Sequence, residues 1–273
     1  MTPRFLLSYS ASPNWLPKVV RARLVASVSA SFQWNRILLD VGGSFTQRDF
    51  DDVATTTTPV NNDDRDRDEF EFDIRTGYEI QESYEAFLQM VLTSVNYDDA
   101  LDDAGVNRDS EGYEIRAGAR VDFTGLLFGD VFAGYLNRDY DDPTLQSVDT
   151  WVAGLDLTWN VTPLTTVKGG VRRTVSETTL AAASGNMTTA FTTSVDHELL
   201  RNLILSARVE VKKDEYEGIS REDDGLSAGV GANYSLNRYF SVVLDYEYSE
   251  RDSSVAGSDN EINKFVLRLR AQL

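Results

Sequence analysis

The feature that most constrains the fold of this chain is a repeated alternation of apolar and polar residues. Between Gly112 and Phe123, apolar side chains occupy every second position, and charged or small residues occupy most positions between them. Successive side chains of a β-strand point to opposite faces, so this period of two predicts strands with one apolar and one polar face. The same alternation returns in five later segments, which begin at Trp151, Leu203, Leu226, Phe240 and Phe265. The chain is therefore predicted to be all-β.

We expect about fourteen strands. Three of them are weakly marked, because the first is short, the fifth has apolar residues in both phases and the tenth is rich in threonine. A count of twelve or sixteen strands therefore stays open. The expected strands are residues 4–11, 21–34, 37–48, 69–79, 84–97, 111–123, 127–138, 149–159, 165–176, 187–196, 203–213, 224–234, 239–249 and 262–273.

The connections between these strands alternate between short and long. Short connections at one edge of a sheet and long ones at the other are typical of an antiparallel up-and-down meander. All six prolines lie outside the expected strand interiors, as strands with paired N–H groups require. The short connections are residues 35–36, 80–83, 124–126, 160–164, 197–202 and 235–238.

The length of the strands separates a membrane barrel from a soluble sandwich. Strands of soluble sheets usually have about five or six residues, whereas many of these have ten or more. Tilted strands of about 9–11 residues cross a bilayer, and a closed barrel pairs every backbone group in lipid. We therefore expect a single transmembrane antiparallel up-and-down β-barrel over residues 1–273, in the bacterial outer membrane. Its turns should be short and periplasmic, and its loops long, acidic and extracellular.

The spacing of aromatic residues on the apolar face tests whether the strands have the length needed to cross a membrane. Trp151 and Trp159 are eight residues apart, which at about 3.4 Å per residue and about 40° of tilt is roughly 21 Å along the membrane normal. This separation is close to that expected of two aromatic girdles, and Tyr113 with Phe123 repeats the measurement. The expected girdle residues are Trp34, Tyr113, Phe123, Trp151, Trp159 and Tyr234.

The charge is distributed unevenly along the sequence. The net charge is −18, and the long loops account for essentially all of it. The inner face should therefore be a nearly neutral lattice of both signs. Either its long side chains form salt-bridge ladders that narrow the lumen, or they line a hydrated conduit that guides a polar solute or sugar chain. The expected lumen-lining residues are Glu114, Arg116, Arg120, Asp122, Lys168, Arg172, Arg208, Glu210, Lys212, Asp245, Glu247, Arg268 and Arg270.

Composition excludes several other classes of protein. The chain has no cysteine, which rules out disulfides, cysteine-based zinc sites and thiol chemistry. Its apolar content is too high for a disordered acidic chain, and its acidity argues against a nucleic-acid partner. No cofactor or metal ligand set is recognised. The first ten residues lack the apolar run of a secretory signal, so either the protein stays in the cytoplasm or the sequence is a mature or trimmed chain. The strand pattern of a membrane barrel favours the second alternative.

From Arg108 onward the sequence resembles a group of outer-membrane β-barrel porins, the "putative beta-barrel porin type 2" family, which is often encoded among exopolysaccharide genes. The resemblance implies an outer-membrane barrel that contacts lipid and lipopolysaccharide. It also implies recognition by the barrel-assembly machinery through the last strand, Phe265 to Leu273, although such barrels usually end in phenylalanine. The residues that carry the resemblance are 125–127, 134–135, 138–143, Trp159, 162–166, 196–202, Tyr234, 236–239 and 251–253.

Three functions from different classes fit these features. The first is a transport channel, in a narrower version a component of exopolysaccharide export. The second is a structural or partner-binding barrel, plugged by its own side chains, whose acidic loops bind a partner or bridge lipopolysaccharide through divalent cations. The third, an outer-membrane hydrolase, would depend on His197, the only histidine. We expect no enzyme, because neighbouring strand residues face opposite ways and Ser194, Asp196 and His197 would then not converge.

Two further patterns have more than one interpretation. The aspartate runs at residues 64–68 and 98–103 could bind Ca²⁺, but both lack the glycine and distal glutamate of an EF-hand loop and are expected to be solvated. The segment 198–202 has the composition of a short turn, so His197 is expected at a rim. Gly229 and Gly231 precede no helix and are expected to leave room for long side chains opposite them.

Overall fold

The computed structural model describes residues 4–11, 22–52, 62–180 and 182–271. Among these residues no helix is both long enough and apolar enough to cross a membrane. One short 3-10 helix, η1 (Asp63–Arg65), precedes the fourth strand. The strands are β1 (Arg4–Ala11), β2 (Ala22–Trp34), β3 (Ile37–Asp49), β4 (Arg67–Gln81), β5 (Tyr84–Tyr97), β6 (Ser110–Asp122), β7 (Leu127–Tyr140), β8 (Val148–Thr162), β9 (Thr165–Glu177), β10 (Gly185–Leu200), β11 (Leu203–Tyr216), β12 (Glu222–Ser235), β13 (Phe240–Ser253) and β14 (Asn260–Ala271).

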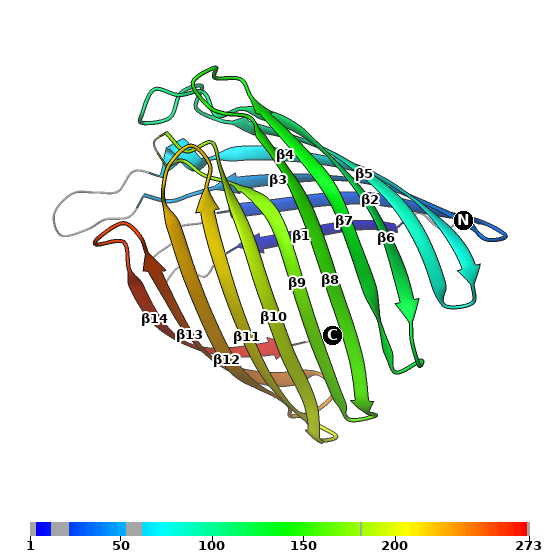
Figure 1. Cartoon of the computed structure of the whole chain (residues 1–273). Helices are drawn as coiled ribbons and strands as arrows, with labels where there is room; N and C mark the ends of the chain where they lie inside the picture. The colour runs from blue at the N-terminus through cyan, green and yellow to red at the C-terminus, as the bar shows by residue number, and fades with distance from the viewer. Residues whose placement is uncertain (1–3, 12–21, 53–61, 181, 272–273) are drawn as a thin grey trace.

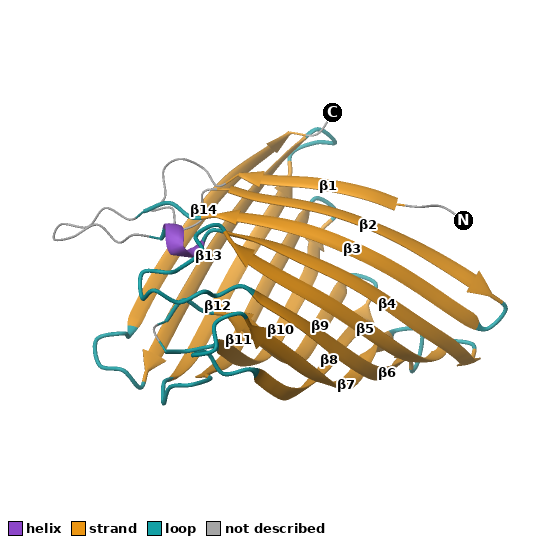
Figure 2. Ribbon diagram, turned by 90° about the horizontal axis from the view of Figure 1, so that it is seen from above, coloured by secondary structure: helices purple, strands orange, loops and turns teal. Residues whose placement is uncertain are grey.

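All fourteen strands belong to one sheet, in which each strand pairs with the next one along the chain. Every pair is antiparallel, so the sheet is an uninterrupted meander from β1 to β14, and no ladder between the described parts of β14 and β1 closes it. The sheet curls round on itself, with the long loops gathered at one end and the short turns at the other (Figures 1 and 2). We call these the loop end and the turn end.

The expected strand count and order are confirmed. Most boundaries differ from the expected ones by three residues or fewer, but β10 continues to Leu200 rather than ending at Asp196. The extension pairs Glu198 with Ile204 and Leu200 with Leu203, with a bulge between the two pairs. The expected turn therefore shrinks to residues 201–202, and the expectation of a turn from residue 198 is wrong. His197 lies within the strand rather than beyond its end.

The two faces of the sheet have opposite character. Apolar side chains on the outer, convex face are exposed, most of all on β14, where Phe265, Leu267 and Leu269 are 66 to 80 % exposed. The six expected girdle residues all lie on this face with exposed rings. An apolar outer face of this extent is the surface that a bilayer covers.

The inner face is less polar than expected. Phe87, Val91 and Val95 of β5 point inward and are buried, which explains why this segment carries apolar residues in both phases. Near the loop end, a cluster of buried residues includes Leu136, Val148, Val152 and Val175, with Tyr140 packed against it. Apolar packing therefore fills part of the interior, where a purely charged lattice had been expected.

The exposed outer face predicts how the protein behaves in solution. Because so much apolar surface would drive aggregation in water, the protein should stay dispersed only in detergent or lipid and show a β-type far-ultraviolet spectrum. Unheated samples should migrate differently from boiled ones on gels. A monodisperse, detergent-free preparation would contradict this assignment of the faces.

Candidate functional site

The expected lumen residues share one face of the sheet. In the register of the sheet, Arg120 lies opposite Asp130, and the row of opposed residues continues through Asp156 and Gly170 to Glu210. Opposed residues face the same way, so these positions all lie on the inner face. Four of the expected arginines form ion pairs between strands, and their side chains are 48 to 62 % exposed. They therefore border open space rather than fill it. The pairs are Arg120–Asp130 (2.8 Å), Arg172–Asp156 (2.6 Å), Arg208–Glu247 and Arg268–Asp245.

The other expected lumen residues behave in three ways. Arg116 pairs with Glu114 on its own strand, and Lys212 pairs with Asp214 at 2.8 Å. Lys168, Glu210 and Arg270 form no ion pair with the residues that the structure describes. Asp122 lies in the wall of the hollow at the turn end of the inner face, as expected. Its carboxylate accepts hydrogen bonds from the backbone N–H groups of Thr124 (3.2 Å) and Gly125 (2.5 Å), so it stabilises the β6–β7 turn and forms no ion pair with the described residues.

The inward glycines make room for these side chains, as expected. A Cβ on Gly229 would lie 3.0 Å from Cζ of Arg208, whose side chain crosses β12 to reach Glu247 on β13. A Cβ on Gly231 would lie 2.7 Å from a carboxylate oxygen of Asp245. Gly229 therefore permits an ion pair that skips a strand, and Gly231 leaves room for the carboxylate of Asp245.

Two hollows on the inner face adjoin one another. The turn-end hollow, of about 600 Å³, is lined by residues that include Glu79, Glu85 and Arg120. The central hollow, of about 510 Å³, is lined by charged groups such as Lys168 and Arg208 and by hydroxyl groups of β8, β10 and β12. Both hollows include Asp156 and Thr158 in their walls, so they lie side by side on the inner face between the turn end and mid-barrel.

At the loop end, one arginine holds a loop against its neighbours. The guanidinium of Arg108, in the β5–β6 loop, pairs with Asp102 at 2.5 Å, and its side chain is 1 % exposed. It also donates hydrogen bonds to three carbonyl groups of the β9–β10 loop (residues 178–184), those of Thr178 (2.8 Å), Leu180 (3.0 Å) and Ala183 (2.9 Å). Burial favours a raised pKa for Asp102, but hydrogen bonds from the Val106 N–H and from Arg108 outweigh it and hold the pKa below its ordinary value.

Hydrogen bonds also join the neighbouring loops. Asn107 N–H donates to Asp142 at 3.2 Å, Gln146 N–H donates to the Ser184 hydroxyl at 2.9 Å, and Ser184 N–H donates to the Glu217 carbonyl at 3.0 Å. Four loops are thus connected through residues 178–180 and 182–184, which carry no charge themselves. The expectation that the run 98–103 is simply solvated is wrong for Asp102, which is almost fully buried.

Three aspartates converge at the loop end, beside the β3–β4 and β5–β6 connections. One oxygen each of Asp49, Asp66 and Asp98 lies within 4.8 Å of the other two, an arrangement of oxygen ligands that could hold a divalent cation. Burial, and then the charges of Asp49 and Asp98, raise the pKa of Asp66 even though its carboxylate accepts the Phe50 N–H at 2.6 Å. Neither aspartate run in the sequence forms this group alone, because each contributes one member and β3 contributes the third.

His197 lies away from a catalytic arrangement. Its Nδ1 contacts the Thr165 hydroxyl at 2.9 Å, while Asp196 accepts a hydrogen bond from the Ser206 hydroxyl at 2.6 Å. Ser194 pairs with Arg208 in the ladder, on the face opposite His197. These three residues therefore do not form a hydrolytic triad.

Sequence reasoning missed Arg108 and the inward apolar residues. A single basic residue in the acidic stretch 98–110 was the available signal for Arg108, because an arginine in such a loop is set to pair with a carboxylate. The apolar residues in both phases of 84–97 were the signal for the packed interior.

The comparison with known families agrees with this architecture. Residues 10–273 match the family described as "Putative beta-barrel porin 2". The chain belongs to this family. The resemblance inferred from the sequence is confirmed, and the protein is an outer-membrane β-barrel of the porin type.

Solved outer-membrane receptors share the fold of this porin-family barrel at low sequence identity, and other solved structures match it more weakly. The alcaligin outer-membrane receptor FauA from Bordetella pertussis has a TM-score of 0.53 and 11% identity, with 98% of this chain and 52% of that chain covered. The ferric enterobactin receptor PfeA from Pseudomonas aeruginosa has a TM-score of 0.50 and 7% identity, covering 91% and 53%. An OmpT loop-deletion mutant from Vibrio cholerae has a TM-score of 0.46 and 11% identity, covering 92% and 90%. No curated protein matches the sequence.

Proposed function

We propose that this porin-family barrel is a channel for hydroxyl-rich polar solutes and, more narrowly, that it takes part in polysaccharide export. The observation that carries the proposal is the pair of adjoining hollows, turn-end and central, on the inner face. Their walls combine half-exposed ion pairs with the hydroxyl groups of Thr158, Thr192 and Ser194. Such walls replace part of the hydration of a passing solute without holding it permanently.

An inward aromatic ring supports a sugar-like solute. Phe132 projects over Gly154, whose missing side chain leaves room for the ring. The guanidinium groups of Arg116 and Arg172 lie 4.9 and 5.8 Å from the centre of the ring. Apolar ring surface beside hydrogen-bonding charges suits a solute with one apolar and one polar face.

Single-channel recording in planar bilayers tests the channel, and release of labelled oligosaccharides from proteoliposomes tests the solute class. We expect a steady current, and release of short neutral oligosaccharides that slows as the chains lengthen. A steady current without oligosaccharide release would leave a channel for small ions and remove the polysaccharide proposal. Absence of current both from the native protein and from a variant without the Arg108 clamp would remove both.

The packed loop end favours a second candidate, a plugged barrel with a structural or partner-binding role. The buried cluster around Val152 and the clamp of Arg108 on residues 178–184 narrow that end. This candidate predicts no current from the native protein in any salt. It is distinguished from a gated channel by whether releasing the loop restores conduction.

The acidic loops should set the ion preference of the open channel. We expect cations to be preferred over anions, and the preference to fade as the Debye length falls from about 8 Å at physiological salt to about 3 Å at 1 M. Replacing Asp63, Asp64, Asp66 and Asp68 together by asparagine should reduce the preference without changing conductance at high salt. Reversal potentials in a salt gradient measure it.

The same preference should depend on pH. Burial and neighbouring carboxylates raise the pKa values of Asp64 and Asp66, so part of the loop charge is lost at a higher pH than for ordinary carboxyl groups. Cation preference should therefore decline on acidification, and less steeply in the fourfold variant. An anion preference at neutral pH would mean that inner arginines control permeation.

A further inference from the structure

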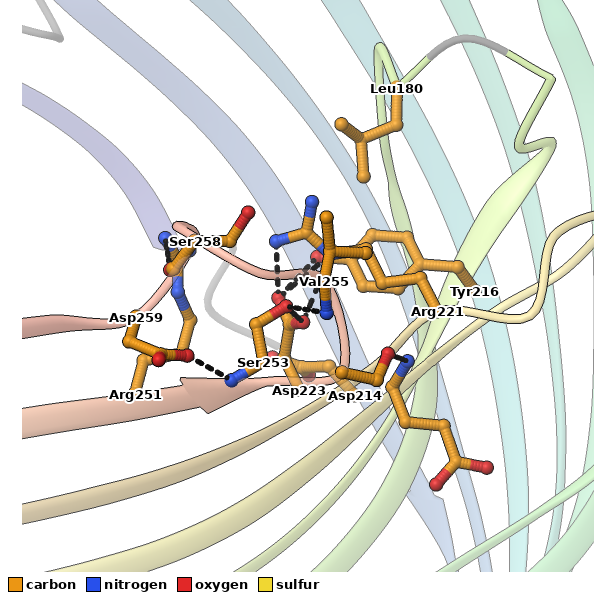
Figure 3. A network of polar contacts seen from close by, with 12 residues as sticks. Leu180, Asp214, Tyr216, Arg221, Asp223, Arg251, Ser253, Val255, Ser258 and Asp259 are labelled. Carbon is orange, nitrogen blue, oxygen red and sulfur yellow. Dashed lines mark hydrogen bonds and ion pairs between the residues drawn. The ribbon is translucent and has the colours of Figure 1, made fainter.

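A third hollow lies at the loop end, inside the ring of acidic loops. It has a volume of about 550 Å³, and segments from β4 to β14 contribute to its wall, so it forms only when the sheet curls round. Leu180 of the clamped β9–β10 loop projects toward it (Figure 3). Basic side chains outnumber acidic ones in its lining, in contrast to the loops around it. The charged lining residues are Arg65, Arg67, Arg221, Arg251, Glu177 and Asp259.

Two of these arginines differ in their partners. Arg221 is neutralised, because it forms a two-pronged pair with Asp223 at 2.7 and 2.9 Å and stacks on Tyr216 (Figure 3). Arg251 donates one hydrogen bond, at 3.1 Å, to the Ser258 carbonyl. Its Nε is buried without a partner, and no carboxylate of the described residues forms an ion pair with it. Arg251 therefore lines the hollow without an ion-pair partner of its own, although the carboxylate of Asp223, already paired with Arg221, lies within electrostatic range.

Other polar atoms around the hollow also lack partners. The hydroxyl of Tyr97, a residue only 8 % exposed, makes no hydrogen bond. Neither does Oε2 of Glu177, whose other oxygen pairs with Arg138, nor Oδ1 of Asn186. Buried polar atoms without partners destabilise a protein, so such a group marks a place where water or a ligand completes the bonding. The loop-end hollow is therefore surrounded by both hydrogen-bond donors and hydrogen-bond acceptors that lack partners.

We propose that the loop-end hollow binds a carboxylate-bearing sugar, a uronic acid unit, with Arg251 as the carboxylate ligand. The planar fork of a guanidinium matches a carboxylate, and sugar hydroxyl groups can donate to Glu177 and Asn186 and accept from Tyr97. A simple anion such as chloride satisfies Arg251 but none of the acceptors. The site therefore selects a hydroxylated anion over small anions without hydroxyl groups. The inference rests on the proposed function for its solute class.

The test uses the folded full chain in a zwitterionic detergent, because sugar-headed detergents would compete. Isothermal titration with sodium glucuronate should give saturable binding, at least ten-fold tighter than glucose and little affected by replacing chloride with another small anion. Arg251→Gln should weaken glucuronate binding about ten-fold, and Arg251→Lys should weaken it less. Arg268→Gln is the matched control on the neighbouring strand, because Arg268 is already paired with Asp245, and it should leave binding unchanged.

Heat-dependent gel migration shows whether each variant is folded, and Asn186→Ala provides a second variant that keeps every charge and should also weaken binding. Equal affinities for glucuronate and glucose, or folded Arg251→Gln with unchanged affinity, would overturn the site. A short oligogalacturonate that binds more tightly than the monomer would identify a polymer as the source of the uronic acid, and equal affinities would identify the free sugar. Titration needs no current, so a binding barrel that does not conduct would refute the channel and leave the site standing.

Discussion

Replacing Arg108 with alanine should release residues 178–184 from the loop end and raise single-channel conductance several-fold. The substitution leaves Asp102 buried without its partner and three carbonyl groups without their donor. Removing one member of a buried ion pair typically costs about 3–5 kcal/mol. Because the barrel wall does not depend on this contact, the loss should appear as local opening of the loop. Limited proteolysis within 178–184 and bilayer recording measure the two effects.

The double variant Arg108→Ala with Asp102→Ala is the control for the uncompensated charge. It should open the loop as well, since the carbonyl groups still lack a donor, but it should cost less stability than the single variant. If residues 178–184 stay protected and conductance is unchanged in both variants, the clamp does not hold the loop. Current from a variant of a silent native protein would instead show that the loop is the plug.

Replacing Leu155 with arginine should strongly impair folding into lipid. Leu155 lies on the outer face, paired with Val131 and Val171, midway between Trp151 and Trp159 on β8. An arginine on the lipid face at the bilayer midplane costs about 2–4 kcal/mol. The midpoint of urea unfolding in lipid vesicles should therefore fall, and the yield of heat-modifiable protein should fall with it.

Thr158→Arg on the same strand provides the comparison. Thr158 lies in the wall of the central hollow, where water and Asp156 can accommodate the added charge, although Lys168 faces it across the ladder. Thr158→Arg should reduce the free energy of unfolding much less than Leu155→Arg does. It should also lower the single-channel conductance, because the longer side chain narrows the central hollow. Equal losses of stability in the two variants would mean that the inner and outer faces have been exchanged.

The sequence by itself determined the strands, their order and their faces. Each of these depends on residues near one another in the chain, since alternation along one strand decides which side chains face lipid. The pattern from Gly112 to Phe123 was enough to place Arg116 and Arg120 inside and Tyr113 outside. The length of the connections then determined the meander, because neighbouring strands joined by short turns must pair.

Only the tertiary structure decided which side chains meet inside the barrel. Arg108 is separated from Ala183 by 75 residues, and Asp49, Asp66 and Asp98 come from the end of β3 and from the two connections that follow β3 and β5. Such contacts depend on the curvature of the sheet and on how each loop folds over the end of the barrel. The alternation of residues within one strand indicates neither of these. For the same reason the alternation predicted a charged interior but not the apolar cluster around Val152, whose members come from β7, β8 and β9. The alternation along a strand assigns each side chain to a face of the sheet. The contacts of that side chain depend on strands and loops that are distant in the sequence and that the curvature of the sheet brings together.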